Sequence, residues 1–219
     1  DIKSTFTSTK HICLLILTIT LVPINIYSEG VKWKIQLKPI ENISYYKSFL
    51  SIFTGLTAGM FFPNRMGNFL GRIFMMENGN RIKAAMVTIV GGMAQMITTV
   101  SLGLIATIFF VNKYLVLLTI SIIIIIALLL LIYFNIHILK YFQFLIPKKF
   151  KDKTKEYLEV FSLYNKKELF KILIISFSRY FIYTFQFVLL IWAFNIPLTY
   201  INAMIPISLT YILMMIIPF

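Results

Sequence analysis

A short polar stretch, residues 61–72, interrupts an otherwise apolar sequence with two arginines and two asparagines. Pro63 removes a backbone donor, and Gly67 and Gly71 permit turns or close backbone approach, so we expect no straight apolar helix to run through it. Guanidinium groups bind phosphate through paired hydrogen bonds, and amides add neutral ones. The stretch therefore predicts a site for a polar head group or substrate, with candidate residues Asn64, Arg65, Asn68 and Arg72.

Three further polar side chains lie inside apolar segments. Arg179 is the one charge well inside a predicted span, which indicates either a functional site or an arginine that snorkels to the interface. Gln186 follows seven residues later and lies on the same helical face, so the two side chains could line one cavity wall. Gln95 indicates an interhelical hydrogen bond or a substrate contact, the first being the more common role of such a residue.

Cysteine and histidine indicate no metal or redox site. Cys13 is the single cysteine, which excludes an intrachain disulfide, and we expect it to be a small buried hydrophobe. His11 and His137 stand at the ends of apolar segments without nearby acidic or cysteine ligands, and we interpret both as interfacial. The sequence also has no Walker loop, dinucleotide fingerprint or nucleophile–base pair, so we expect no metal, no cofactor and no enzymatic activity.

The composition determines the class of protein that must position these residues. Hydrophobic residues make up 59% of the 219 positions and charged residues only 13%, whereas soluble domains carry about 25% charged residues. Together with a mean hydropathy of +0.85, this predicts an all-α, polytopic transmembrane bundle. The formal net charge of +13 lies almost wholly between the apolar segments. Anionic lipid head groups and the positive-inside rule explain this charge, so we expect membrane lipids and no nucleic acid as partners.

We expect a single integral membrane domain over residues 1–219 that is incomplete at both ends, because no initiator Met opens it and its last apolar segment is unfinished. A basic cytoplasmic loop is expected over residues 140–171. The predicted spans are residues 11–27, 45–62, 84–110, 114–137, 169–194 and an incomplete 199–219.

Two segments near the N-terminus need a separate interpretation. Residues 28–47 are predicted to form an amphipathic surface connection in which Trp33 is an interfacial anchor. Residues 45–62 either span the membrane or re-enter on the same side, with a re-entrant or broken helix over Tyr45–Arg72. Lys and Arg in the loops divide 17 against three between the two sides if the segment re-enters and 15 against five if it spans, which mildly favours re-entrance.

Three short motifs follow one another along the chain. In chain order they are Asn25 with Glu29 and Lys32-Trp33-Lys34, then Pro63-Asn64-Arg65-Met66-Gly67-Asn68 with Gly71-Arg72, then Ser178-Arg179-Tyr180 with Gln186-Phe187. Their order and spacing resemble the membrane region of the lysylphosphatidylglycerol synthase family, a flippase-like group of bacterial and archaeal membrane proteins, and the third motif resembles its Bacteroidota form. The resemblance covers nearly the whole chain.

The resemblance implies a stand-alone membrane module that binds or translocates a phospholipid or a polyprenyl-linked lipid head group. In this hypothesis Arg65, Arg72 and Arg179 hold the phosphate in a protein-lined groove while the acyl chains remain in lipid. Hydrogen bonds to the rest of the head group would come from Asn64, Asn68, Gln95 and Gln186. The implied location is the bacterial inner membrane, with multiple spans.

Two departures from the family pattern limit what the resemblance implies. Asn68 stands where the family usually has glutamate, which argues against a proton-coupled or cation-binding role at that position. The chain also lacks the cytosolic aminoacyl-transfer domain of the family's enzymes. Two other classes stay open: an accessory membrane subunit of a lipid-modifying or glycosyltransferase system that transports nothing, and a secondary transporter of a small solute.

Overall fold

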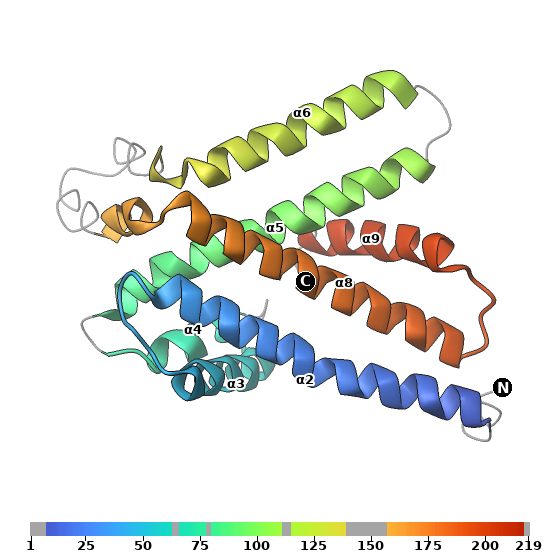
Figure 1. Cartoon of the computed structure of the whole chain (residues 1–219), viewed down its shortest axis with the longest axis horizontal. Coiled ribbons are helices and arrows are strands. Elements are labelled where there is room, and N and C mark those ends of the chain that lie inside the picture. The colour runs from blue at the N-terminus through green and yellow to red at the C-terminus, as the bar shows by residue number, and fades with distance from the viewer. Residues whose placement is uncertain (1–7, 63–65, 78–79, 111–114, 139–156, 217–219) are drawn as a thin grey trace.

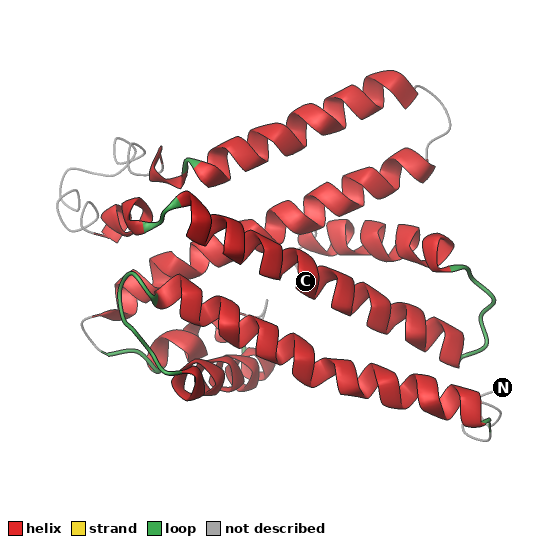
Figure 2. Cartoon of the chain, viewed as in Figure 1, coloured by secondary structure: helices red, strands yellow, loops and turns green. Residues whose placement is uncertain are grey.

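The computed structural model describes residues 8–62, 66–77, 80–110, 115–138 and 157–216. Within these ranges the chain is an all-helical bundle with short connecting loops, which confirms the predicted fold class (Figure 2). The helices are α2 (Thr9–Leu37), α3 (Tyr45–Phe61), α4 (Met66–Phe74), α5 (Arg81–Phe110), α6 (Leu115–Phe134), the 3-10 helix η5 (Glu159–Leu163), α8 (Lys166–Ala193) and α9 (Tyr200–Ile216).

Helices α2, α5, α6 and α8 are each long and apolar enough to cross a membrane, and α9 is a shorter apolar helix. The protein is therefore a multi-pass membrane protein. The four differ in how much of their surface the protein covers: α5 and α8 are much more buried than α6, whose isoleucine-rich and leucine-rich surface is mostly exposed. We expect α6 to face lipid, because its apolar side chains have few protein neighbours.

Helices α2 and α8 lie side by side, and α5 packs against α6, α8 and α9 (Figure 1). The larger hydrophobic core fills the end of the bundle where α2 ends and α5 and α8 begin, around Trp33, Val87 and Ile172. A smaller cluster, including Val188 and Ala203, joins α8 to α9. The larger core thus packs α2, α5 and α8 together, and polar side chains of these helices also face one another.

The predicted surface connection over residues 28–47 is wrong in its first ten residues. Helix α2 does not stop near Tyr27 but continues to Leu37, and its last turns are buried by α3, α5 and α8. Trp33 is fully buried in the larger core, so it is not an interfacial anchor. The charges in this segment suggested a surface, but the buried ones among them, Glu29 and Lys32, pair with each other inside the protein.

Predictions for three other residues can be compared with their observed exposure. Cys13 is exposed on α2, so the prediction of a buried hydrophobe is wrong. Its neighbours in the first half of α2 are also largely exposed apolar residues, because few protein elements pack there. His11 is buried near the start of the same helix, and His137 is exposed after the end of α6.

The predicted break between Tyr45 and Arg72 is confirmed, and it takes the form of a helical hairpin. Helix α3 ends at Phe61, and α4 returns along it toward the end of the bundle where α2 stops and α5 starts (Figure 1). Gly67 and Gly71 of α4 face the carbonyl oxygens of Ala58 and Thr54, where any Cβ would overlap backbone atoms. The two helices therefore approach as closely as small residues allow.

A set of short polar contacts fixes this hairpin to α2. The Ser48 hydroxyl donates to the Gly30 carbonyl at 2.6 Å, and the Ser44 side chain caps α3. Lys47 pairs with Glu41 at 2.6 Å in the connection between the helices. Burial raises the pKa of Glu41, but hydrogen bonds from Lys47 and Asn80 outweigh it and leave the pKa below its ordinary value. The hairpin is thus held in one position beside α2.

Residues 139–156 lie outside the described part of the chain, so most of the predicted basic loop does too. Its remainder contains η5, where Val160 and Phe161 are buried, and the start of α8. Asn165 and Glu168 form a reciprocal capping box there, which satisfies the first backbone donors of α8. This cap fixes the starting point of the helix that carries Arg179.

Candidate functional site

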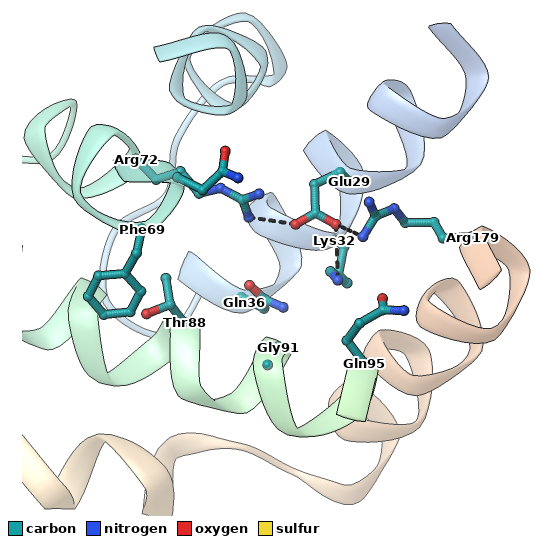
Figure 3. A pocket seen from close by; sticks show the side chains of 11 residues that line it. Glu29, Lys32, Gln36, Phe69, Arg72, Thr88, Gly91, Gln95 and Arg179 are labelled. Atoms are coloured by element: carbon teal, nitrogen blue, oxygen red, sulfur yellow. Dashed lines mark hydrogen bonds and ion pairs between the residues drawn. The ribbon is translucent and has the colours of Figure 1, made fainter. Parts of the chain in front are cut away.

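A single carboxylate contacts three cations where α2, α4 and α8 meet. Oε1 of Glu29 accepts from Nη1 of Arg72 at 2.5 Å. Its Oε2 accepts from Nζ of Lys32 at 3.0 Å and from Nη1 of Arg179. Because Arg72 belongs to α4 and Arg179 to α8, Glu29 connects three helices at one point (Figure 3). Sequence separations of 43 and 150 residues are closed by these two contacts.

Arg179 lies near the middle of α8, whereas Lys32 and Arg72 lie near the ends of α2 and α4. Arg179 is thirteen residues after Lys166, ~20 Å along α8 at about 1.5 Å per residue, and slightly farther from the end of that helix. Its Nε also donates to Oδ1 of Asn25 on α2 at 3.0 Å. The arginine is therefore held by protein at the middle of α8, and the snorkelling alternative is not what the structure shows.

The charges of the cluster are buried or partly buried, and the cations outnumber the carboxylate. The side chains of Glu29 and Lys32 are 8% and 4% exposed, and those of Arg72 and Arg179 are 17% and 14% exposed. The one carboxylate balances only one of the three cations. A buried charge without a counter-charge is costly, so an excess of positive charge inside the bundle indicates a functional site.

A cavity of about 280 Å³ opens beside the cluster. Helix α5 closes its far side with neutral residues, and Figure 3 shows the amides of Gln36 and Gln95 on either side of the space next to Lys32. The lining consists of Glu29, Lys32, Gln36, Asn68, Phe69, Arg72, Thr88, Gly91, Gly92, Gln95 and Arg179. Cation and amide donors thus dominate the polar wall.

Several polar atoms in this wall are buried and have no hydrogen-bond partner in the described part of the chain. They are Nε2 of Gln36, Oδ1 of Asn68, Nε of Arg72 and Oε1 of Gln95. Buried polar groups are almost always paired, so four such atoms around one cavity indicate a place where a polar ligand or water binds. Two of these atoms are donors, Nε2 of Gln36 and Nε of Arg72, and two are acceptors, the amide oxygens of Asn68 and Gln95. The described residues bring no three His, Cys, Asp or Glu side chains together.

The neighbours of the cluster fix its geometry. Gln36 sits against Gly91, where any Cβ would overlap its amide group. The Tyr164 hydroxyl donates to the Gln36 carbonyl at 2.5 Å, which holds the end of α2 in place. The guanidinium of Arg72 lies over the Trp33 ring at 5.9 Å, so the buried tryptophan supports one wall of the cavity.

The structure brings together four of the seven residues predicted for the site. Asn68, Arg72, Gln95 and Arg179 all line the cavity. Gln186 does not: its amide donates to the Thr18 carbonyl at 3.0 Å in a separate α8–α2 contact. Asn64 and Arg65 lie outside the described residues.

Sequence reasoning missed Glu29, Lys32 and Gln36 as residues of the site. Lys32 and Gln36 follow Glu29 by three and seven residues, so the three side chains share one helical face. The segment was nevertheless interpreted as a surface connection. The position of Glu29 among the motifs shared with the lysylphosphatidylglycerol synthase family was the signal that could have identified it.

Comparison with known families agrees with that resemblance. The family model described as the lysylphosphatidylglycerol synthase TM region matches residues 1–219. The chain belongs to this family. The comparisons with curated proteins and with solved structures gave no match. In this lysylphosphatidylglycerol synthase TM region the cationic cavity lies between α2, α4, α5 and α8, where all three short motifs contribute a charged side chain.

Proposed function

We propose that the protein is a flippase-like protein that binds a lipid head group through its phosphate and moves it across the membrane. The observation that carries this proposal is the excess of buried and partly buried cations around one cavity inside the bundle. Glu29 prevents Lys32, Arg72 and Arg179 from repelling one another, and a ligand anion would supply the remaining negative charge. The proposed role involves no covalent step and no cofactor.

The chemistry of the wall supports a phosphate ligand. A guanidinium has five N–H donors. Arg179 donates from Nε to Asn25 and from Nη1 to Glu29, which leaves its other nitrogen available. Nε of Arg72 has no acceptor among the described residues. Planar guanidinium groups bind phosphate oxygens in pairs. The acyl chains of such a lipid would remain in the bilayer while the head group occupies the cavity. The location proposed is the bacterial cytoplasmic membrane.

Transport can be tested in liposomes that contain the purified protein and phospholipids with fluorescent head groups. Dithionite quenches only outer-leaflet probes, so protein-dependent crossing appears as quenching beyond one half of the signal. We expect crossing with the native protein and a loss of at least about ten-fold in rate for Arg72→Gln and Arg179→Gln, since each removes a charge-assisted contact. Lys171→Gln is the matched control, because Lys171 is an exposed cation on the same helix as Arg179.

The outcomes separate the proposal from its two rivals. Crossing that is unchanged in Arg72→Gln and Arg179→Gln would contradict the role given to the cavity. No crossing of anionic, zwitterionic or polyprenyl-phosphate lipids, from protein that elutes as a folded species, would favour an accessory subunit. Uptake of a labelled soluble phosphate compound into the liposomes without lipid crossing would favour a solute transporter.

A further inference from the structure

We infer that the cavity selects a phosphate monoester, a dianion with three terminal oxygens, over the phosphodiester of common phospholipid head groups. This inference rests on the proposed function and specifies its substrate class. The ligand chemistry is a terminal phosphate, which a lipid phosphomonoester or a free phosphate ion could both supply.

The first argument is the balance of charge. The described lining residues comprise the cations Lys32, Arg72 and Arg179 and the single carboxylate Glu29, an excess of two positive charges. The wall contributed by α5 is neutral, with Thr88 and Gln95 as its polar side chains. A phosphodiester carries one negative charge and would leave one buried cation unbalanced. A phosphate monoester carries nearly two near neutral pH and balances the site.

The second argument is the arrangement of donors. The three cations come from α2, α4 and α8 and converge on Glu29 from different directions, as Figure 3 shows. A phosphodiester presents two terminal oxygens, whereas a monoester presents three, one for each cation. The unpaired Nε2 of Gln36 adds a neutral donor, and Gln36 itself is only 2% exposed. The wall therefore offers more donors than a diester can satisfy.

The third argument is size. Ligand pockets usually measure roughly 300–1,000 Å³. The cavity beside the cluster measures about 280 Å³, just below that range. A terminal phosphate fits this volume, so the size of the cavity is compatible with the ligand class that the charge excess favours.

The inference is tested by binding to the detergent-solubilised protein, measured by native mass spectrometry with three lipids of identical acyl chains. Phosphatidic acid is the monoester, phosphatidylglycerol is the singly charged diester, and cardiolipin carries two charges on two separate diesters. We expect phosphatidic acid to bind about ten-fold more tightly than either of the others, since one additional charge-assisted contact is worth about that factor. Cardiolipin separates the chemistry of the monoester from total charge.

Two substitutions change the charge excess in opposite directions. Arg179→Gln lowers it, and we expect the preference for phosphatidic acid over phosphatidylglycerol to fall at least three-fold. Glu29→Gln raises it and removes the competing carboxylate, and we expect phosphatidic acid to bind at least as tightly as before. Lys171→Gln should leave the preference unchanged. Size-exclusion elution shows whether each variant is folded. Either Arg179→Gln or Glu29→Gln, compared with Lys171→Gln, is enough to test the inference.

Inorganic phosphate distinguishes the source of the ligand. If millimolar phosphate displaces phosphatidic acid and binds without lipid, the monoester chemistry is supported and its source is the free ion. If phosphate does not compete, the source is the lipid. Equal or tighter binding of phosphatidylglycerol or cardiolipin would overturn the inference while leaving the proposed lipid-binding function intact. Binding of no lipid and no phosphate would overturn both.

Discussion

Helices α2 and α8 are joined by two polar contacts that differ in kind. Gln186 of α8 donates one neutral hydrogen bond to the Thr18 carbonyl. Arg179, seven residues earlier on α8, donates to Glu29 and Asn25 beside a cavity. Gln186 is buried, and its side chain has no fully buried polar atom without a partner among the described residues. The Arg179 contact belongs to a cluster with excess positive charge and several unpaired polar atoms.

The two contacts differ in whether they leave polar groups without a partner. A contact complete in itself satisfies its own groups and stabilises the helix pair, as Gln186 does. A contact that leaves charges and donors over at the same depth is costly unless another group completes it. The proposed function therefore places ligand binding at Arg179 and helix association at Gln186. The predictions below alter one contact at a time, beginning with the largest expected effect.

Replacing Glu29 with alanine should have the largest effect on stability. It leaves Lys32, Arg72 and Arg179 close together without their counter-charge, and breaking a buried ion cluster in this way costs about 3–5 kcal/mol. We expect a marked fall in the thermal unfolding midpoint in detergent. Adding a phosphate-bearing lipid should recover part of this loss, because a ligand that binds only the folded state stabilises it.

Glu77→Ala is the matched control for Glu29→Ala, because Glu77 is exposed and takes no part in the cluster. It should change the unfolding midpoint little and show no recovery with lipid. A small loss of stability for Glu29→Ala would show that solvent screens the cluster and would remove the distinction drawn between the two contacts.

Replacing Gly71 with alanine should have the next largest effect. Its Cβ would overlap the carbonyl of Thr54, and backbone atoms cannot move aside as a flexible side chain can. Overpacking of this kind costs about 1–3 kcal/mol and separates α4 from α3. Because α4 carries Arg72, lipid crossing should also fall, while the contact between Arg179 and Glu29 remains. Normal crossing in a destabilised Gly71→Ala protein would contradict the role of Arg72.

The fold was predictable from the sequence to the extent that apolar length and breakers determine it. Apolar runs predicted the helices, and Pro63 with the glycines predicted the break between α3 and α4. The end of α2 was not predictable by the same rule. Charged residues near Glu29 usually mark the membrane surface, but here they pair with Arg72 and Arg179, whose positions depend on tertiary structure.

The site was predictable in its arginines but not in its centre. Arg72 and Arg179 stand out because charge is rare in this chain, whereas Glu29 gains its meaning only from partners 43 and 150 residues away. The face shared by Arg179 and Gln186 was correctly inferred from helical period, yet the two side chains have different neighbours. Helical spacing predicts which face of α8 a side chain lies on, and the packing of α2 against that face determines which residues the side chain contacts.

Replacing Gln186 with leucine should have a smaller effect, confined to stability. Side-chain hydrogen bonds between membrane helices contribute about 0.6 kcal/mol on average and at most about 1.7 kcal/mol. We expect a loss within that range by thermal unfolding, with lipid crossing equal to that of the native protein. If Gln186→Leu instead abolished crossing without loss of stability, Gln186 would contact the ligand and the two ends of α8 would share one function.

The smallest effect on stability is expected for Gly91→Ala, for which Gly92→Ala is the matched control. Alanine is favoured over glycine in a helix by about 1 kcal/mol, so both changes gain in propensity. At Gly92 a Cβ meets nothing within 4 Å, and we expect a slight stabilisation with unchanged crossing. At Gly91 it overlaps the Gln36 amide, which must turn away from its place in the cavity.

For Gly91→Ala we therefore expect nearly native stability and a crossing rate lowered about ten-fold or more, because a hydrogen bond to a charged ligand contributes about 1.5–3 kcal/mol. Both variants keep every charge of the cluster, so the pair separates the shape of the cavity from its electrostatics. Equal crossing rates in the two variants would show that the ligand depends on the cations alone and that Gln36 belongs with Gln186 among the structural amides.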